Sequence, residues 1–189
     1  GLRTGCGLAH HGAPSLGRAS RSGALARGTA VGWEAVQESG VTPNLELCDT
    51  GEAVHVIRLT SRASFLSGVW HAAGVLADAV LPNQDAPGVA CVFAPKAYGA
   101  WSLHNASATG AMDVVAFFSS VAALLGGAGQ ANYAAANACL DALATSRRTH
   151  GAAGTSVQWG AWAEVCIAAR GSAIERLAAI ADAWGLSRL

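Results

Sequence analysis

Three polar residues in the second half of the chain have side chains that can form hydrogen bonds or exchange a proton. Ser120 closes an apolar run, and Tyr133 and Asn137 follow a glycine-rich stretch, four positions apart. Residues four apart lie on one face of a helix. Because ligands bind at the carboxyl ends of strands in open α/β sheets, we predict that the three side chains converge on a ligand there.

The elements that would position these side chains alternate between strands and helices. Short apolar runs predict strands over 68–70, 114–118 and 155–157. Composition and periodicity predict helices over 89–107, 132–146 and 173–183. The first of these helices is expected to be broken by Pro95 or to start near it. This alternation predicts an α/β fold with a doubly wound parallel sheet.

The composition excludes several classes of protein. The chain has 189 residues, enough for about one domain, and its 52% hydrophobic and 13% charged residues argue against disorder. Twelve basic residues balance twelve acidic ones without a basic run, so nucleic acid is not an expected partner. No apolar run reaches the roughly 20 residues of a membrane span, and residues 1–11 contain no signal-peptide core. Five cysteines without a CxxC pair predict free thiols in a reducing compartment, the cytoplasm.

Five segments carry a family resemblance: Phe118–Ala122, Gly129–Asn137, His71–Leu76, Pro95–Trp101 and Gln158–Gly160. They resemble the ketoreductase domains of modular polyketide synthases, in the short-chain dehydrogenase/reductase superfamily. The resemblance covers most of residues 67–165 and implies a Rossmann-like fold. It implies a catalytic set of four residues at the family's spacing, namely Lys96, Ser120, Tyr133 and Asn137.

The resemblance implies that NADPH reduces a β-ketoacyl thioester, in polyketide or fatty acid biosynthesis. Hydride delivery to a ketone creates an alkoxide, which needs a hydrogen-bond donor and a proton. Tyr133 would supply the proton, and Ser120 would hold the carbonyl oxygen. The charge of Lys96 would favour loss of the phenol proton, whose pKa is ordinarily about 10. Asn137 would hold the water or backbone group that returns a proton to Tyr133.

The resemblance also implies a set of cofactor contacts: Gly5, Gly7, Ser20, Arg21, Asp49, Ala72, Ala73 and Gly74. Gly5 and Gly7 would form the glycine-rich turn that brings backbone N–H groups to the pyrophosphate. Ser20 and Arg21 would meet the 2′-phosphate of NADPH, and Asp49 would lie near the adenine. Only fifteen positions separate Gly5 from Ser20, so the first βαβ unit is expected to be shortened.

Three positions imply the stereochemical class. Asp78 matches the last residue of the family's Leu-Asp-Asp marker, and Leu125 stands where the opposite class has Trp. Both imply a B-type reductase that gives a D-hydroxyl, so Asp78 is assigned to the substrate and its stereochemistry. Ala135 in place of Pro favours the unepimerised subtype.

A single ketoreductase-like domain is expected over residues 1–189, as a fragment of a larger synthase. It would comprise a degenerate cofactor-binding half (1–66), a catalytic half (67–165), and a lid with a truncated C-terminal helix (166–189). In that lid, Cys166–Ile167 replace the family's Gly-Met.

The implied partners are an acyl carrier protein, whose phosphopantetheine holds the β-ketoacyl group, and other synthase domains. No metal site is expected, because no second ligand lies at turn or helical spacing from His71, which we interpret as a packed or capping imidazole. Two alternatives stay open: a degenerate ketoreductase that does not bind NADPH, and a non-catalytic structural or docking module. NADPH binding separates the enzyme from both.

Overall fold

Strands and helices alternate along the computed structural model, which describes residues 2–25, 28–63, 66–107 and 112–160. The strands are β1 (Ser15–Ser20), β2 (Thr42–Leu47), β3 (Gly68–His71), β4 (Val114–Ser120) and β5 (Thr155–Trp159). The α-helices are α1 (Leu2–His10), α2 (Ala30–Glu38), α3 (Ala53–Arg62), α4 (Ala86–Phe93), α5 (Gly99–Ala106), α6 (Ala122–Leu125) and α7 (Ala131–Thr149). A 3₁₀ turn, η1 (Leu81–Asn83), and a π-helical turn, η2 (Ala94–Tyr98), complete the described elements.

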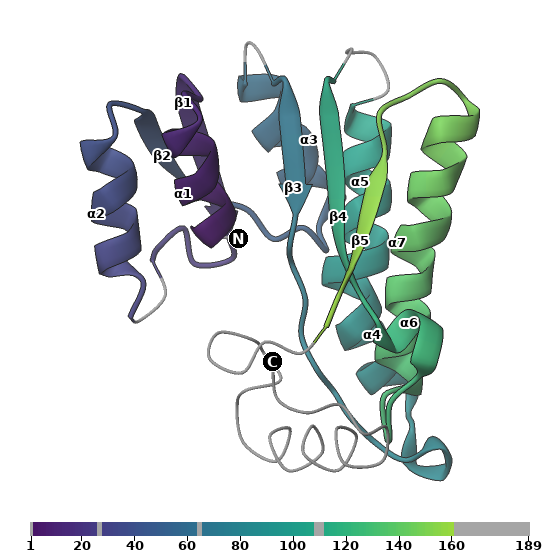
Figure 1. The fold of residues 1–189 in the computed structure, drawn as a ribbon. Coiled ribbons are helices and arrows are strands. Elements are labelled where there is room, and N and C mark those ends of the chain that lie inside the picture. The colour runs from purple at the N-terminus through teal and green to yellow at the C-terminus, as the bar shows by residue number, and fades with distance from the viewer. Residues whose placement is uncertain (1, 26–27, 64–65, 108–111, 161–189) are drawn as a thin grey trace.

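The strands form two parallel sheets. β1 pairs with β2, and a second sheet has the order β3-β4-β5. All five strands run downward in Figure 1, and helices such as α1, α2 and α7 return upward between them. The predicted Rossmann-like α/β fold is therefore confirmed, with its carboxyl strand ends gathered at one edge.

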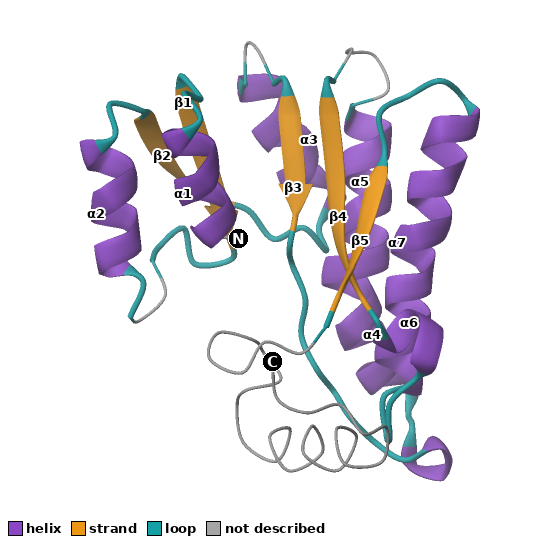
Figure 2. Ribbon diagram, viewed as in Figure 1, coloured by secondary structure: helices purple, strands orange, loops and turns teal. Residues whose placement is uncertain are grey.

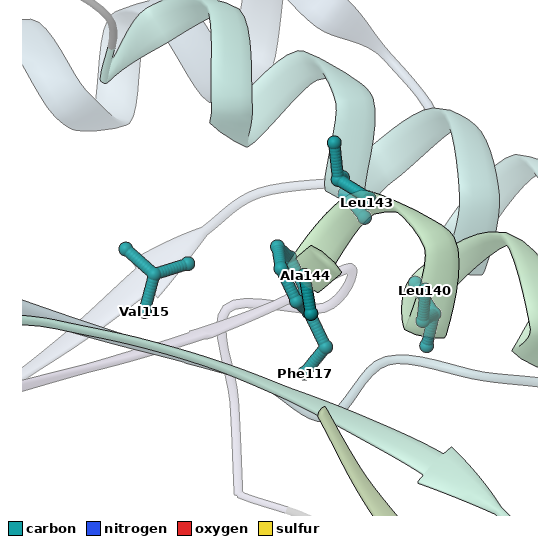
Figure 3. Close-up of a cluster of buried hydrophobic side chains, with 6 residues drawn as sticks. Val115, Phe117, Leu140, Leu143 and Ala144 are labelled. Carbon is teal, nitrogen blue, oxygen red and sulfur yellow. The ribbon is translucent and has the colours of Figure 1, made fainter. Parts of the chain in front are cut away.

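The largest core cluster lies between β4 and α7. Val115 and Phe117 of β4 are buried against three residues of α7, Leu140, Leu143 and Ala144, as Figure 3 shows. Complete burial of a Leu or Phe side chain stabilises a fold by about 1.5–3 kcal/mol. This packing fixes α7, and with it Tyr133 and Asn137, against the end of β4.

The helix predicted over 89–107 contains a π-helical turn at Pro95. Proline has no N–H, so it cannot donate the regular helical hydrogen bond. The chain continues as α4, η2 and α5 without a break, and Gly99 N–H donates to the carbonyls of Ala94 and Lys96. Lys96 lies inside this turn.

One sequence-based prediction is wrong: Thr4–Leu8 does not form a strand-to-helix turn. Gly5 and Gly7 lie within helix α1, and neither has a positive φ. A Cβ added to either glycine would meet no atom within 4 Å, so neither position requires glycine. Between Gly5 and Ser20 the described chain holds the rest of α1 and all of β1.

Two further expectations concern the C-terminal part. The helix over 173–183 and the lid around Cys166–Ile167 lie outside the described residues. Within the described ranges, no helix is both long enough and apolar enough to cross a membrane.

Candidate active site

Lys96 is the buried centre of the candidate site. Its side chain is only 4% exposed. Nζ donates to Asn137 Oδ1 at 2.8 Å and to the carbonyl of Phe118 at 3.0 Å. Gly74 leaves room for the lysine stem, since a Cβ there would lie 2.9 Å from Lys96 Cε. The ammonium is therefore fixed between β4, α7 and the loop after β3.

The π-helical turn that carries Lys96 is held by two side chains from other segments. Thr50 Oγ1 donates to the carbonyl of Pro95 at 3.2 Å. His71 Nε2 lies 3.2 Å from the carbonyl of Lys96, so this nitrogen carries the proton and donates. The carbonyls of Pro95 and Lys96 thus accept hydrogen bonds from side chains outside the helix. The Lys96 side chain is buried.

Tyr133 and Asn137 meet Lys96 from one face of α7, as their spacing predicts. Lys96 Nζ lies 5.3 Å from the centroid of the Tyr133 ring. Asn137 is fully buried, and its Nδ2 donates to the carbonyl of Tyr133 at 2.8 Å. Ser119 Oγ also donates to the carbonyl of Asn137 at 3.3 Å, which ties α7 to the end of β4. Lysine, asparagine and tyrosine therefore form one connected group.

Ser120 ends β4, two residues after the carbonyl that Lys96 contacts. Its Oγ accepts a hydrogen bond from Ala122 N–H at 3.2 Å. That bond uses an oxygen lone pair and leaves the hydroxyl proton available for donation. The side chain is half-buried, consistent with a residue that can reach a ligand.

Gln130 and Asn132, on either side of Ala131, were not predicted from the sequence as site residues. Both fix the loop that follows β3. Asn132 is 4% exposed; its Nδ2 donates to the carbonyl of Ala77, and its Oδ1 accepts from Tyr133 N–H. Gln130 Nε2 donates to Asp78 Oδ2 at 3.3 Å. Asp78 is thereby held at the start of the helix that carries Tyr133. One signal in the sequence could have indicated Asn132. It is an asparagine in the otherwise alanine-rich first turn of a helix, where N–H groups without a helical partner need acceptors.

Comparison with known proteins identifies the family. Residues 1–164 match the family profile of the KR domain. This chain belongs to the KR, or ketoreductase, domain family. It is 43% identical over 147 residues to polyketide synthase GfsA of Streptomyces halstedii, a match that covers 76% of this chain and 2% of that protein. It is 38% identical over 158 residues to erythronolide synthase EryA2 of Saccharopolyspora erythraea, covering 83% and 4%.

Solved ketoreductase structures share the fold of this KR domain. A structure of A-type ketoreductases from a modular polyketide synthase superposes with a TM-score of 0.88 at 36% identity, covering 94% of this chain and 38% of the other. The first ketoreductase of the tylosin synthase gives 0.84 at 36% identity, with coverages of 94% and 39%. The chain thus spans a small part of its curated relatives and well under half of these structures.

The predicted cofactor residues of the KR domain lie at the carboxyl ends of their strands, with two exceptions. Ser20 ends β1, Arg21 follows it, and Asp49 comes just after β2, which pairs with β1. Asp49 Oδ1 accepts from Gly51 N–H at 3.0 Å. Ala72, Ala73 and Gly74 directly follow β3. Gly5 and Gly7 are the exceptions, because they lie inside α1.

The residues predicted to contact a nicotinamide dinucleotide fall into two groups in this KR domain. Gly74, in the loop after β3, lies against Lys96, whereas Ser20 and Asp49 lie at the ends of the paired strands β1 and β2. The first group would hold the nicotinamide end and the second the adenosine end. The pyrophosphate needs a glycine-rich turn at a helix N-terminus, and the described residues provide none beside β1 or β3. Likewise, no group of three or more potential metal ligands occurs among the described residues.

His71 makes the stability of the KR domain pH-dependent. Burial lowers the pKa of this imidazole from 6.5 to about 4, and the nearby Lys96 charge acts in the same direction. The unfolded chain therefore takes up a proton near pH 6.5 that the folded chain refuses until about pH 4. We therefore expect the contribution of neutral His71 to the free energy of unfolding to be fully present above pH 6.5 and to fall by up to about 3 kcal/mol as the pH drops to 4.

Urea unfolding of the wild type and of His71→Gln at several pH values measures this effect. The glutamine amide can still donate toward the Lys96 carbonyl but does not titrate. Between pH 7.5 and 4.5 the free energy of unfolding should fall less in the variant than in the wild type. We expect the difference to be most of the roughly 3 kcal/mol assigned to His71. Equal losses in the two proteins would contradict the assignment to His71.

Asn132→Leu is expected to loosen the loop after β3. Leucine has a similar size, but it leaves the Ala77 carbonyl and the Tyr133 N–H without their side-chain partner. We expect a loss of about 2 kcal/mol in the free energy of unfolding and faster amide exchange over residues 75–80. The matched control is Asn105→Leu on the exposed face of α5, which should change neither. Unchanged exchange in Asn132→Leu would contradict the role of Asn132.

Proposed function

We propose that this KR domain reduces a β-ketoacyl thioester to a β-hydroxyacyl thioester with NADPH, on an acyl carrier protein of a polyketide or fatty acid synthase. The observation that best supports this proposal is the buried ammonium of Lys96. Its Nζ is hydrogen-bonded to Asn137 and lies 5.3 Å from the ring centroid of Tyr133. Such a charge favours the phenolate and so makes loss of the tyrosine proton to a ketone oxygen less costly. The four free cysteines among the described residues agree with a cytoplasmic setting.

Each residue of the group has a separate task in this proposal. The cofactor supplies the hydride. Ser120 donates a hydrogen bond to the ketone oxygen, and Tyr133 gives its phenol proton to the oxygen as negative charge develops there. The adjacent Lys96 stabilises the phenolate that remains. Asn137 holds Lys96 and the backbone of Tyr133, so the two groups keep their separation during the reaction.

The proposed stereochemistry is B-type, with a D-hydroxyl product. It rests on Asp78, which Gln130 holds at the start of α7, and on Leu125 in place of Trp. One similar structure is of A-type ketoreductases, a class that is stated for those proteins alone. Chiral analysis of the product from a 3-oxoacyl thioester tests the assignment, and an L-hydroxyl product would refute it.

The first test is a titration of the purified chain with NADPH, in which nicotinamide fluorescence reports binding. Saturable binding, followed by NADPH oxidation with a 3-oxoacyl thioester, supports the proposed reaction. A cooperatively folding chain that gives no fluorescence change would refute NADPH-dependent reduction by this chain. That result would favour the second candidate, a degenerate ketoreductase, which is supported by the position of Gly5 and Gly7 inside α1.

A further inference from the structure

The loop that follows β2 packs closely against the π-helical turn η2. This loop, residues 49–52, is the teal segment that leads from β2 to α3 in Figure 2. A Cβ added to Gly51 would lie 3.2 Å from Ala94 Cβ. A Cβ added to Gly99 would lie 2.9 Å from Thr50 Cβ and 3.0 Å from the Thr50 carbonyl oxygen. The two segments therefore approach so closely that Gly99 cannot gain a side chain unless one of them moves.

One helical hydrogen bond is displaced inside η2. In a regular α-helix the N–H of Gly99 would donate to the carbonyl of Pro95, four residues earlier. It donates instead to the carbonyls of Ala94 and Lys96. The Pro95 carbonyl accepts from the Thr50 hydroxyl at 3.2 Å. The hydroxyl thus takes the place of the donor that a regular helix would supply.

The Thr50 hydroxyl is positioned by the loop itself. Asp49 Oδ1 accepts from the N–H of Gly51, and the Asp49 carbonyl accepts from the N–H of Glu52, so hydrogen bonds close the loop. The N–H of Asp49 donates to Nδ1 of His55, in the first turn of α3, at 3.3 Å. Because these bonds fix the loop, little conformational freedom is lost when its hydroxyl donates to η2.

The register of η2 determines where Lys96 lies. One turn of an α-helix holds 3.6 residues, so a change from the π to the α register rotates the segments on either side by roughly 100° relative to each other. In the π register Lys96 Nζ donates to Asn137 Oδ1 and lies 5.3 Å from the ring centroid of Tyr133. Lys96 is part of the turn, so a change of register would disturb both contacts.

We infer that Thr50 is a positioning residue for Lys96, because its hydroxyl selects the π-helical register of η2 over the α-helical one. Without the hydroxyl, the Pro95 carbonyl finds its replacement donor in the Gly99 N–H of an α-helical turn. The effect on the register is independent of any reaction, whereas the effect on turnover rests on the proposed reduction.

Chemical labelling of Lys96 tests the register without cofactor or substrate. Lys96 is the single lysine in the sequence, so an amine-acetylating reagent modifies one side chain, which mass spectrometry separates from the N-terminal amine. Thr50→Val keeps the shape of the residue and removes the hydroxyl, whereas Thr50→Ser keeps the hydroxyl. A neutral hydrogen bond shifts an equilibrium by roughly two- to tenfold. We expect acetylation of Lys96 to be about three- to tenfold faster in Thr50→Val and unchanged in Thr50→Ser.

Thr60→Val is the matched control. It removes a threonine hydroxyl that donates to the carbonyls of Val56 and Ile57 within α3, and it should leave the labelling of Lys96 at the wild-type rate. Equal labelling in Thr50→Val and the wild type would overturn the inference. An equal rise in Thr60→Val would also overturn it, because a general loss of stability would then explain the faster labelling. A rise in Thr50→Ser equal to that in Thr50→Val would exclude the hydroxyl as the cause.

Turnover is a separate readout of the same variants. Where the proposed reduction occurs, kcat should fall by about three- to tenfold in Thr50→Val, with little change in KM for NADPH or the thioester, and should recover in Thr50→Ser. An unchanged kcat beside faster labelling would overturn the positioning role of Thr50. No turnover in any variant or in the wild type, with the labelling as expected, would refute the proposed function and leave the register assignment in place.

Discussion

Tyr133→Phe is expected to abolish ketone reduction while leaving the fold intact. Phenylalanine keeps the ring that lies over Lys96 and removes the one atom that can give a proton. Loss of a positioned general acid costs about 10²- to 10⁴-fold in rate. We expect kcat to fall by at least about 100-fold, with little change in the affinity for NADPH.

The chain offers a matched control, because it contains only two tyrosines. Tyr98 is 57% exposed at the end of the π-helical turn, two residues from Lys96 in sequence. Tyr98→Phe makes the same chemical change without touching the buried group, so its kcat should stay at the wild-type value. A Tyr133→Phe variant that retained more than about a tenth of the activity would remove Tyr133 from the role of acid.

The elements that carry the candidate site could be predicted because their signals are local. A continuous apolar run forecast β4, an alanine-rich stretch forecast α7, and a four-residue spacing placed Tyr133 and Asn137 on one face. The structure adds what no local signal contains. The burial of Lys96 depends on a π-helical turn at Pro95 and on a donor from His71, which is 25 positions away.

The predicted turn at Gly5 and Gly7 is instead helical, because composition alone does not separate a helix from a glycine-rich turn there. Two glycines spaced by one residue matched only part of the fingerprint, because His10 stands where the third glycine is expected. Their helical cost relative to alanine, about 1 kcal/mol each, is offset by packing of α1. Ala9 of α1 is buried with Val36 and Val41, and Cys6 packs against this cluster. Tertiary contacts of that kind link α1 to residues 27 to 35 positions later, and a motif search within ten residues does not detect them.

Lys96→Met is expected to lower both stability and activity, and a second substitution separates the two effects. Methionine fills the space of the lysine stem but leaves Asn137 Oδ1 and the Phe118 carbonyl without the Nζ donor. Buried acceptors left unpaired cost about 1–3 kcal/mol. Asn137→Leu alone should cost a similar amount, because it deprives the buried ammonium of one acceptor.

The double variant Lys96→Met/Asn137→Leu replaces both polar partners by apolar groups, which is far less costly than removing one of them. We expect a double-mutant cycle on the free energy of unfolding to give a coupling of about 1–2 kcal/mol, with the double variant more stable than the sum of the single losses predicts. Reduction should stay at the low level of Lys96→Met, because no cation remains beside Tyr133. Recovery of activity together with stability would mean that Lys96 only holds the fold, whereas recovery of stability alone assigns its charge to proton transfer.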